Sequence, residues 1–157
     1  MKKILDKKIL NHQQTQLFAK NLYKKYLSQE KNFTIFFEGG LGAGKTYIIR
    51  EILKNFGITD EITSPTYVYV NEYANKENPS QKFAHFDLYR IKDDNNFYAH
   101  GFEEIFTNKE INKFVEWPDK ISREIRHLAS GTIYFVNVKH GISAGLRRII
   151  VHRGVNN

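Results

Sequence analysis

Residues 39–46 are the stretch of this sequence whose residue types and spacing indicate a chemistry most directly. They read Gly-Gly-Leu-Gly-Ala-Gly-Lys-Thr, which fits the pattern G-x-x-x-x-G-K-[ST] at every required position. A loop that wraps its N–H groups around phosphate oxygens needs residues without a Cβ atom, while Lys45 adds a mobile positive charge and the Thr46 hydroxyl suits Mg²⁺. The pattern predicts a nucleoside triphosphate site formed by Gly40, Leu41, Gly42, Ala43, Gly44, Lys45, Thr46 and Tyr47.

The segments on either side of this loop have the patterns of a strand and a helix. Aromatic and β-branched residues from Phe33 to Phe37 indicate a short buried strand, and apolar residues recur at helical spacing from Tyr47 to Phe56. Gly57 follows as the residue expected to end that helix. A strand, a glycine-rich loop and a helix in this order favour a phosphate site over an ordinary glycine turn with a surface lysine.

A nucleotide bound with Mg²⁺ needs a carboxylate near Thr46, because a hard cation takes oxygen ligands and proteins of this kind place an acid at the end of a buried strand. Asp87 and Glu116 each end a strand-like run. Structural alternatives exist for both: Asp87 would pair with Arg90, and Glu116 would be a solvated acid in a turn. Residue patterns leave open which acid would hold the metal ion and which would orient a water molecule.

Two ring-bearing residues beside these acids have structural as well as functional interpretations. Trp117 is equally consistent with a core residue and with a side chain packed over the nucleotide site. His85 is interpreted as a packed strand histidine, because no second His or Cys stands at metal-ligand spacing in the sequence. The sequence therefore does not support a zinc site.

Composition favours a single domain over residues 1–157, because 41% hydrophobic and 14% aromatic residues supply enough apolar surface for a core. No apolar stretch approaches the length of a membrane span and the basic start lacks a signal-peptide core, so an intracellular, cytoplasmic protein is expected. The absence of cysteine excludes disulfides and thiolate metal sites. The net charge is +7, but the basic residues are scattered, so charge alone does not indicate nucleic-acid binding.

The remaining periodicities complete a mixed pattern of helices and strands. Residues 12–28 are expected to form an amphipathic helix, because Phe18, Leu22 and Tyr26 fall four residues apart. Strands are expected at 67–73 and 82–91, as antiparallel neighbours, and then at 113–117, 132–139 and 147–152, with a helix around 121–128 and a turn at 141–145. The predicted fold class is α/β: a single P-loop NTPase-like domain with a mixed, partly parallel central sheet flanked by helices.

Four segments taken together resemble the TsaE (YjeE) family of bacterial ATPases. They are Gly39 to Thr46, Ser64-Pro65-Thr66-Tyr67, His85-Phe86-Asp87-Leu88-Tyr89-Arg90 and Glu116-Trp117. Their order and spacing match the family as well, and the resemblance covers nearly the whole chain. The HxDLYR and EW elements are far more specific than the phosphate loop.

The resemblance implies a protein that binds ATP and Mg²⁺ and supports synthesis of threonylcarbamoyladenosine next to the anticodon of tRNA. Such a protein is the ATPase accessory of TsaD and TsaB, and it meets tRNA indirectly through their complex. The resemblance further implies that Lys45 grips the β and γ phosphates and that Thr46 and Glu116 coordinate Mg²⁺. Asp87 would fill the Walker B position and act on the metal ion through water.

The resemblance also assigns roles to residues outside the loop and the two acids. Ser64, Pro65 and Thr66 would form a switch segment that senses the γ-phosphate. Thr15 falls where the family has a nucleotide-contacting threonine at the end of S-x-E-x-T, although the other residues of that motif differ here. Asp119 stands where the family often has a glutamate in E-W-x-E, so a shorter carboxylate would serve any nucleotide contact there.

Phosphoryl transfer to water needs positioned phosphates, a charge-neutralising Mg²⁺ and an oriented water molecule. No transition-state arginine is identifiable among the scattered arginines, so we expect slow hydrolysis by the isolated chain and completion of the site by partner proteins. Two other functions fit the loop. A small-molecule kinase would carry an arginine-bearing lid, and a nucleotide-dependent binding module would not hydrolyse ATP in its working cycle.

Overall fold

A computed structural model of the chain describes residues 1–141 and 145–154. Its strands are β1 (Lys2–Ile9), β2 (Phe33–Glu38), β3 (Val70–Ala74), β4 (Lys82–Asp87), β5 (Ile111–Glu116), β6 (Thr132–His140) and β7 (Arg147–Arg153). Its helices are α1 (His12–Lys25), α2 (Lys45–Asn55), α3 (Asp94–Ala99), α4 (Phe102–Thr107) and α5 (Arg123–His127), with 3-10 turns η1 (Leu27–Gln29) and η2 (Pro118–Lys120).

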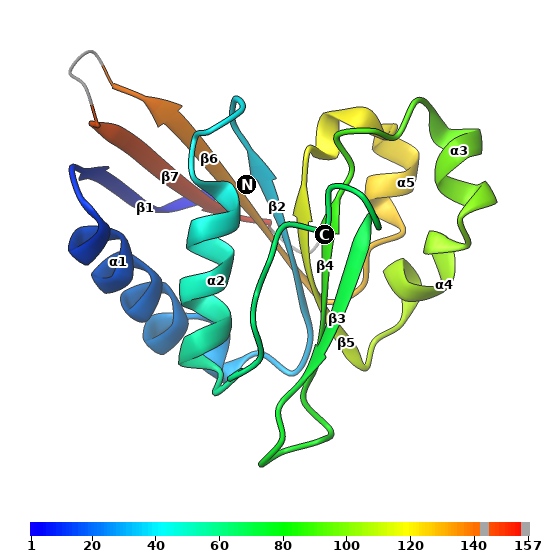
Figure 1. Cartoon of the computed structure of the whole chain (residues 1–157), viewed down its shortest axis with the longest axis horizontal. Coiled ribbons are helices and arrows are strands. Elements are labelled where there is room, and N and C mark those ends of the chain that lie inside the picture. The colour runs from blue at the N-terminus through cyan, green and yellow to red at the C-terminus, as the bar shows by residue number, and fades with distance from the viewer. Residues whose placement is uncertain (142–144, 155–157) are drawn as a thin grey trace.

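The strands form one sheet in the order β1-β7-β6-β2-β5-β4-β3. Helices α1 and α2 lie on one side of this sheet, and α3, α4 and α5 lie on the other (Figure 1). Strand β2 pairs in parallel with both β5 and β6, and β4 pairs in parallel with β5, whereas β1, β3 and β7 run antiparallel to their neighbours. The expected mixed, partly parallel sheet flanked by helices is confirmed.

The parallel centre of the sheet brings the candidate site residues to one edge. Phe37 on β2 pairs with Glu116 on β5, and Asp87 on β4 pairs with the same glutamate. Because the carboxyl ends of parallel strands meet at a common edge, both acids lie beside the loop that follows β2. The register in which β2, β5 and β4 pair therefore brings the two acids to the loop, and no local sequence pattern specifies that register.

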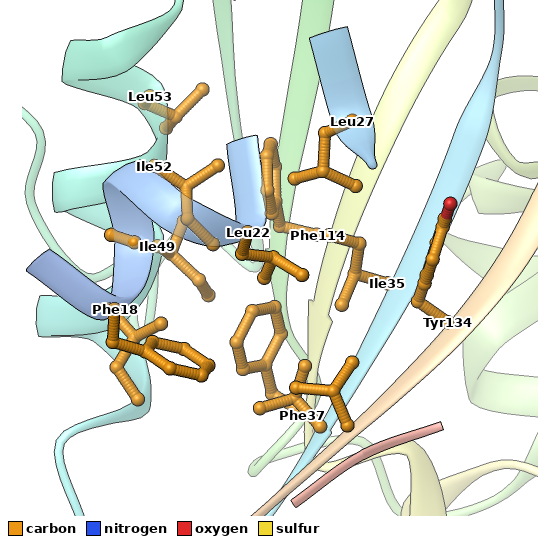
Figure 2. Close-up of a cluster of buried hydrophobic side chains, with 14 of the residues drawn as sticks. Phe18, Leu22, Leu27, Ile35, Phe37, Ile49, Ile52, Leu53, Phe114 and Tyr134 are labelled. Atoms are coloured by element: carbon orange, nitrogen blue, oxygen red, sulfur yellow. The ribbon is translucent and has the colours of Figure 1, made fainter. Parts of the chain in front are cut away.

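Both faces of β2 are buried, which explains its nearly continuous apolar sequence. Phe33, Ile35 and Phe37 point to the side covered by α1 and α2, and Phe36 points to the side covered by α4. Figure 2 shows the first cluster, in which Phe18 and Leu22 of α1 and Ile49, Ile52 and Leu53 of α2 surround the strand side chains. Burying each such side chain contributes about 1.5–3 kcal/mol. The loop is thus held between a buried strand and a helix that is buried along one face.

Most of the expected elements are confirmed, with shifted boundaries. The first helix ends at Lys25 and continues as η1 instead of running to residue 28. The strand expected from Tyr67 begins only at Val70, because the N–H groups of Val68 and Tyr69 donate to the carbonyl of Pro65 and close a turn. The strand expected to reach residue 91 ends at Asp87. The turn expected at 141–145 lies partly outside the described residues.

Strand β1 and helices α3 and α4 are not among the elements expected from the sequence. Most of β1 is exposed or half-buried and it carries paired lysines, so its apolar alternation is weak; it is held by antiparallel pairing with β7. Helices α3 and α4 are six residues each, too short to show a helical period, and are held by burial of Phe97, Phe102 and Phe106. No helix within the described residues is long and apolar enough to cross a membrane.

Lys113 on β5 is a fully buried lysine, and it makes stability depend on pH. Its ammonium donates to the carbonyl of Asn108 and the hydroxyl of Ser130, and burial lowers its pKa to about 8. Since the unfolded chain then binds more protons than the folded chain above pH 8, the Lys113 contribution should raise the free energy of unfolding by about 2 kcal/mol between pH 8 and pH 10. Urea unfolding of wild type and Lys113→Met at both pH values should show a larger rise in wild type than in the variant; equal pH slopes would contradict it.

Candidate nucleotide-binding site

The glycine-rich loop connects the end of β2 to the start of α2 and is shaped by positive φ angles. Gly42 and Gly44 have φ values of 71° and 97°, in the left-handed region that glycine occupies without strain. At Gly39 the backbone of β6 leaves no room for a side chain, because an added Cβ atom would lie 2.5 Å from the carbonyl oxygen of Val138. The loop glycines are therefore required by conformation and by close packing.

Gly39→Ala is expected to destabilise the fold by about 2 kcal/mol, because the new methyl group must displace the backbone of β6. Gly40→Ala is the matched control, since no atom lies within 4 Å of a Cβ built at Gly40. Thermal unfolding of both variants gives the comparison. Equal melting temperatures for the two would show that the loop yields at Gly39.

Lys45, the first residue of α2, lies folded back over the loop and is only 4% exposed. Its Nζ donates to the carbonyl oxygens of Gly39 and Gly40 at 2.8 and 3.0 Å, and it lies 3.9 Å from the ring centroid of Trp117. Burial lowers the pKa of Lys45, and the carboxylates of Glu116, Asp87 and Asp119 act in the opposite direction. The arrangement holds a partly desolvated cation over the mouth of the loop.

Glu116 joins the helix that follows the loop to the neighbouring strand β4. Its Oε1 accepts a hydrogen bond from Thr46 Oγ1 at 2.7 Å and lies 2.8 Å from His85 Nε2. Glu116 is 3% exposed, so its interpretation as a solvated turn acid is wrong. The interpretation of His85 as a packed strand histidine is confirmed, since it is fully buried, but its contact with the acid was not predicted.

Asp87 ties a neighbouring loop to the site instead of pairing with Arg90. Its Oδ2 accepts hydrogen bonds from Ser64 Oγ at 3.1 Å and Thr66 Oγ1 at 2.6 Å, and its Oδ1 accepts from the N–H of Tyr89. The guanidinium of Arg90 lies over the ring of Tyr67, 4.4 Å from its centroid. The expected switch segment, Ser64, Pro65 and Thr66, is therefore anchored to the acid at the end of β4.

Trp117 packs over the site, which favours the second of its two interpretations. It is half-buried, adopts a φ of 59°, and lies against Lys45 and the ring of Tyr89. Asp119 follows in η2 and is exposed on the same side as Lys45, whose pKa it influences.

The remaining predicted contacts lie around the start of α2. Leu41 is exposed at the tip of the loop, and Tyr47 packs edge-on against His12 at the start of α1. Thr15 is buried within α1, and its hydroxyl donates to the carbonyl of Asn11 one turn earlier. A threonine hydroxyl used in this way is an ordinary feature of a helix. The nucleotide contact of Thr15 stays a prediction.

The oxygen atoms beside Thr46 fit Mg²⁺, which needs few protein ligands, better than a metal ion that is coordinated by protein side chains alone. Among residues 1–141 and 145–154, no group of three His, Cys, Asp or Glu side chains is placed to hold a metal ion. Mg²⁺ dehydrates reluctantly and is usually bound by one or two protein oxygens together with phosphates and waters. The adjoining oxygens of Thr46 and Glu116 supply what such a site requires from the protein.

A parallel-centred sheet with helices on both sides defines an α/β protein, and its glycine-rich loop leads into α2 with a lysine folded over it. A family model described as "Threonylcarbamoyl adenosine biosynthesis protein TsaE" matches residues 9–144. The chain belongs to the TsaE family, which takes part in tRNA threonylcarbamoyladenosine biosynthesis.

Individual relatives agree with this assignment. The tRNA threonylcarbamoyladenosine biosynthesis protein TsaE of Rickettsia typhi is 37% identical over 124 residues, which cover 78% of this chain and 75% of the relative. The protein of the same description from Haemophilus influenzae is 36% identical over 103 residues, covering 66% and 61% of the two chains. The crystal structure of Bacillus subtilis YdiB superposes with a TM-score of 0.69 at 22% identity, covering 97% of this chain and 86% of that one, and supports the fold.

Proposed function

We propose that this chain binds ATP with Mg²⁺ and hydrolyses it slowly, as an accessory of the TsaB and TsaD proteins in threonylcarbamoyladenosine modification of tRNA. The observation that carries the proposal is the contact between Thr46 and Glu116, 2.7 Å long, directly after a loop of phosphate-binding pattern. It places a hydroxyl and a carboxylate side by side where the metal ion of a bound triphosphate would need oxygen ligands. Membership of the TsaE family supplies the pathway.

In this proposal each residue acts on a different part of the nucleotide. The loop N–H groups hold the phosphates, and Lys45 exchanges its two carbonyl partners for β- and γ-phosphate oxygens. Bound Mg²⁺ would neutralise developing phosphate charge, held by Thr46 and Glu116. Asp87 acts through water, and its release of Ser64 and Thr66 would let the switch segment respond to the γ-phosphate.

The partner proteins are proposed to complete the site and raise the rate of hydrolysis. ATP then acts as a timer for assembly and release of the modification complex, and tRNA is met only through that complex. The proposal includes a cytoplasmic location for the chain.

The direct test combines partner, cofactor and function. Purified chain is incubated with TsaB and TsaD, with and without MgATP, and both co-purification and the amount of modified tRNA are measured. We expect ATP-dependent association and modified tRNA that requires this chain. Unchanged modification when the chain is omitted would contradict the proposal, and transfer of labelled phosphate to a metabolite instead of water would indicate a kinase.

A further inference from the structure

The side chain of Arg147, the first residue of β7, lies directly against the phosphate loop. A Cβ atom built on Gly44 would fall 2.8 Å from Arg147 Nη1 and 3.2 Å from its Cζ. Gly44 is the residue immediately before Lys45, and it opens α2. The guanidinium therefore touches the loop where its backbone turns into the helix, within reach of a ligand held by the loop N–H groups.

Arg147 approaches the loop from the side opposite to the two acids. Strand β2, which carries the loop, is flanked by β5 and β4 on one side and by β6 and β7 on the other. Glu116 and Asp87 belong to the first pair of strands, and Arg147 to the second. Its backbone is fixed on both sides by pairing with Ile9 of β1 and His140 of β6. A strand paired on both sides thus supports this arginine.

Arg147 differs from the other arginines of β7 because its guanidinium is not paired with a carboxylate among the described residues. Arg148 forms a two-bond ion pair with Asp6, and Arg153 pairs with Glu30. Among the described residues, Arg147 forms no ion pair with a carboxylate and no side-chain hydrogen bond. A half-buried guanidinium without an anionic partner, beside a loop built for phosphate, has the chemistry of an anion ligand.

We propose that Arg147 is a nucleotide-binding residue that grips the phosphates shared by ATP and ADP. The inference rests on the proposed function, because the anion it invokes is the nucleotide of the same loop. The loop N–H groups cradle the α- and β-phosphates while the loop lysine reaches the β- and γ-phosphates. Lys45 lies on the side of the loop that carries the acids. Arg147 lies on the other side, where it would donate hydrogen bonds to the α- and β-phosphates.

The test compares Arg147→Ala, Arg147→Gln and Arg147→Lys with Arg148→Ala, using calorimetric affinities for MgATP and MgADP. A charge-assisted contact with phosphate is worth about tenfold to a hundredfold in affinity, so Arg147→Ala and Arg147→Gln should lose that factor for both nucleotides. Arg147→Lys should retain part of it, because the charge remains. Arg148→Ala is the control, since it removes the neighbouring guanidinium, which forms its ion pair with Asp6 of β1.

Three results would overturn the inference. If Arg147→Gln binds both nucleotides as tightly as wild type does, Arg147 does not contact the phosphates. If only the affinity for ATP falls, the arginine contacts the γ-phosphate instead of the α- and β-phosphates. A fall in phosphate release with unchanged affinity for both nucleotides would make it a transition-state group instead. Arg147→Gln replaces the guanidinium with a shorter, uncharged amide that can still donate hydrogen bonds. Its melting temperature, compared with that of wild type, separates misfolding from lost binding. If wild type itself binds no MgATP, the proposed function fails, which is a distinct outcome.

Discussion

Lys45→Ala is expected to weaken binding of MgATP by about 100-fold or more and to reduce phosphate release accordingly. The physical reason is the loss of a mobile, partly desolvated cation whose hydrogen bonds to phosphate oxygens contribute about 1.5–3 kcal/mol each. Its present partners are the carbonyl oxygens of Gly39 and Gly40 and the ring of Trp117, so the melting temperature of the variant is measured alongside its affinity. Calorimetry with MgATP measures the effect.

Lys54→Ala is the matched control for this variant. Lys54 lies on the same helix, but it is exposed and pairs with Glu51, so its loss removes one positive charge without touching the loop. Its affinity for MgATP should stay within about twofold of wild type, because Lys54 lies in the last turn of α2, at the end of the helix away from the loop. Near-normal affinity of Lys45→Ala, or an equal loss in both variants, would contradict a specific grip on phosphate.

Glu116→Gln is expected to lower Mg²⁺-dependent phosphate release by about 100-fold or more, while nucleotide binding measured without Mg²⁺ changes by less than about threefold. The amide keeps the volume of the side chain and an oxygen that accepts the bond from Thr46, but it loses the charge that a hard cation requires. Phosphate release followed over a range of Mg²⁺ concentrations should show that excess metal restores little of the activity.

Glu110→Gln is the control for the second variant, because it removes an exposed carboxylate just before the other end of β5. If Glu116→Gln releases phosphate at the wild-type rate, Glu116 is not a ligand of the metal ion, and Asp87 becomes the candidate ligand. A separate result, normal tRNA modification with Glu116→Ala, would favour a binding module that does not need to hydrolyse ATP.

The loop and its flanking strand and helix could be predicted from the sequence because their signals are local. The spacing of Gly39, Lys45 and Thr46 encodes a backbone shape, and burial on both faces makes β2 read as a continuous apolar run. Gly57, expected to end the helix, has a φ of 82° and its N–H donates to the carbonyl of Lys54. Local chemistry sufficed for these elements.

The distinction between the two acids could not be predicted, since it depends on strand register and on loops distant in sequence. Glu116 meets Thr46 across 70 positions, and Asp87 accepts its bond from Thr66 across 21. For Arg147 the sequence predicts only a place in a strand, because nothing near it in the sequence indicates that β7 begins beside Gly44. The sequence shows that residue 147 is a positively charged arginine, but only the fold shows that its side chain lies beside the loop.

Trp117, the only tryptophan of the sequence, makes this chain its own optical probe. Its indole ring stands 3.9 Å from the ammonium of Lys45, and the emission of an indole responds to the electric field of a charge at that range. A ligand that draws the ammonium away from the carbonyl oxygens of Gly39 and Gly40 will alter the intensity or colour of that emission. Occupancy of the site can then be followed in real time, without a dye, an isotope or a coupled enzyme.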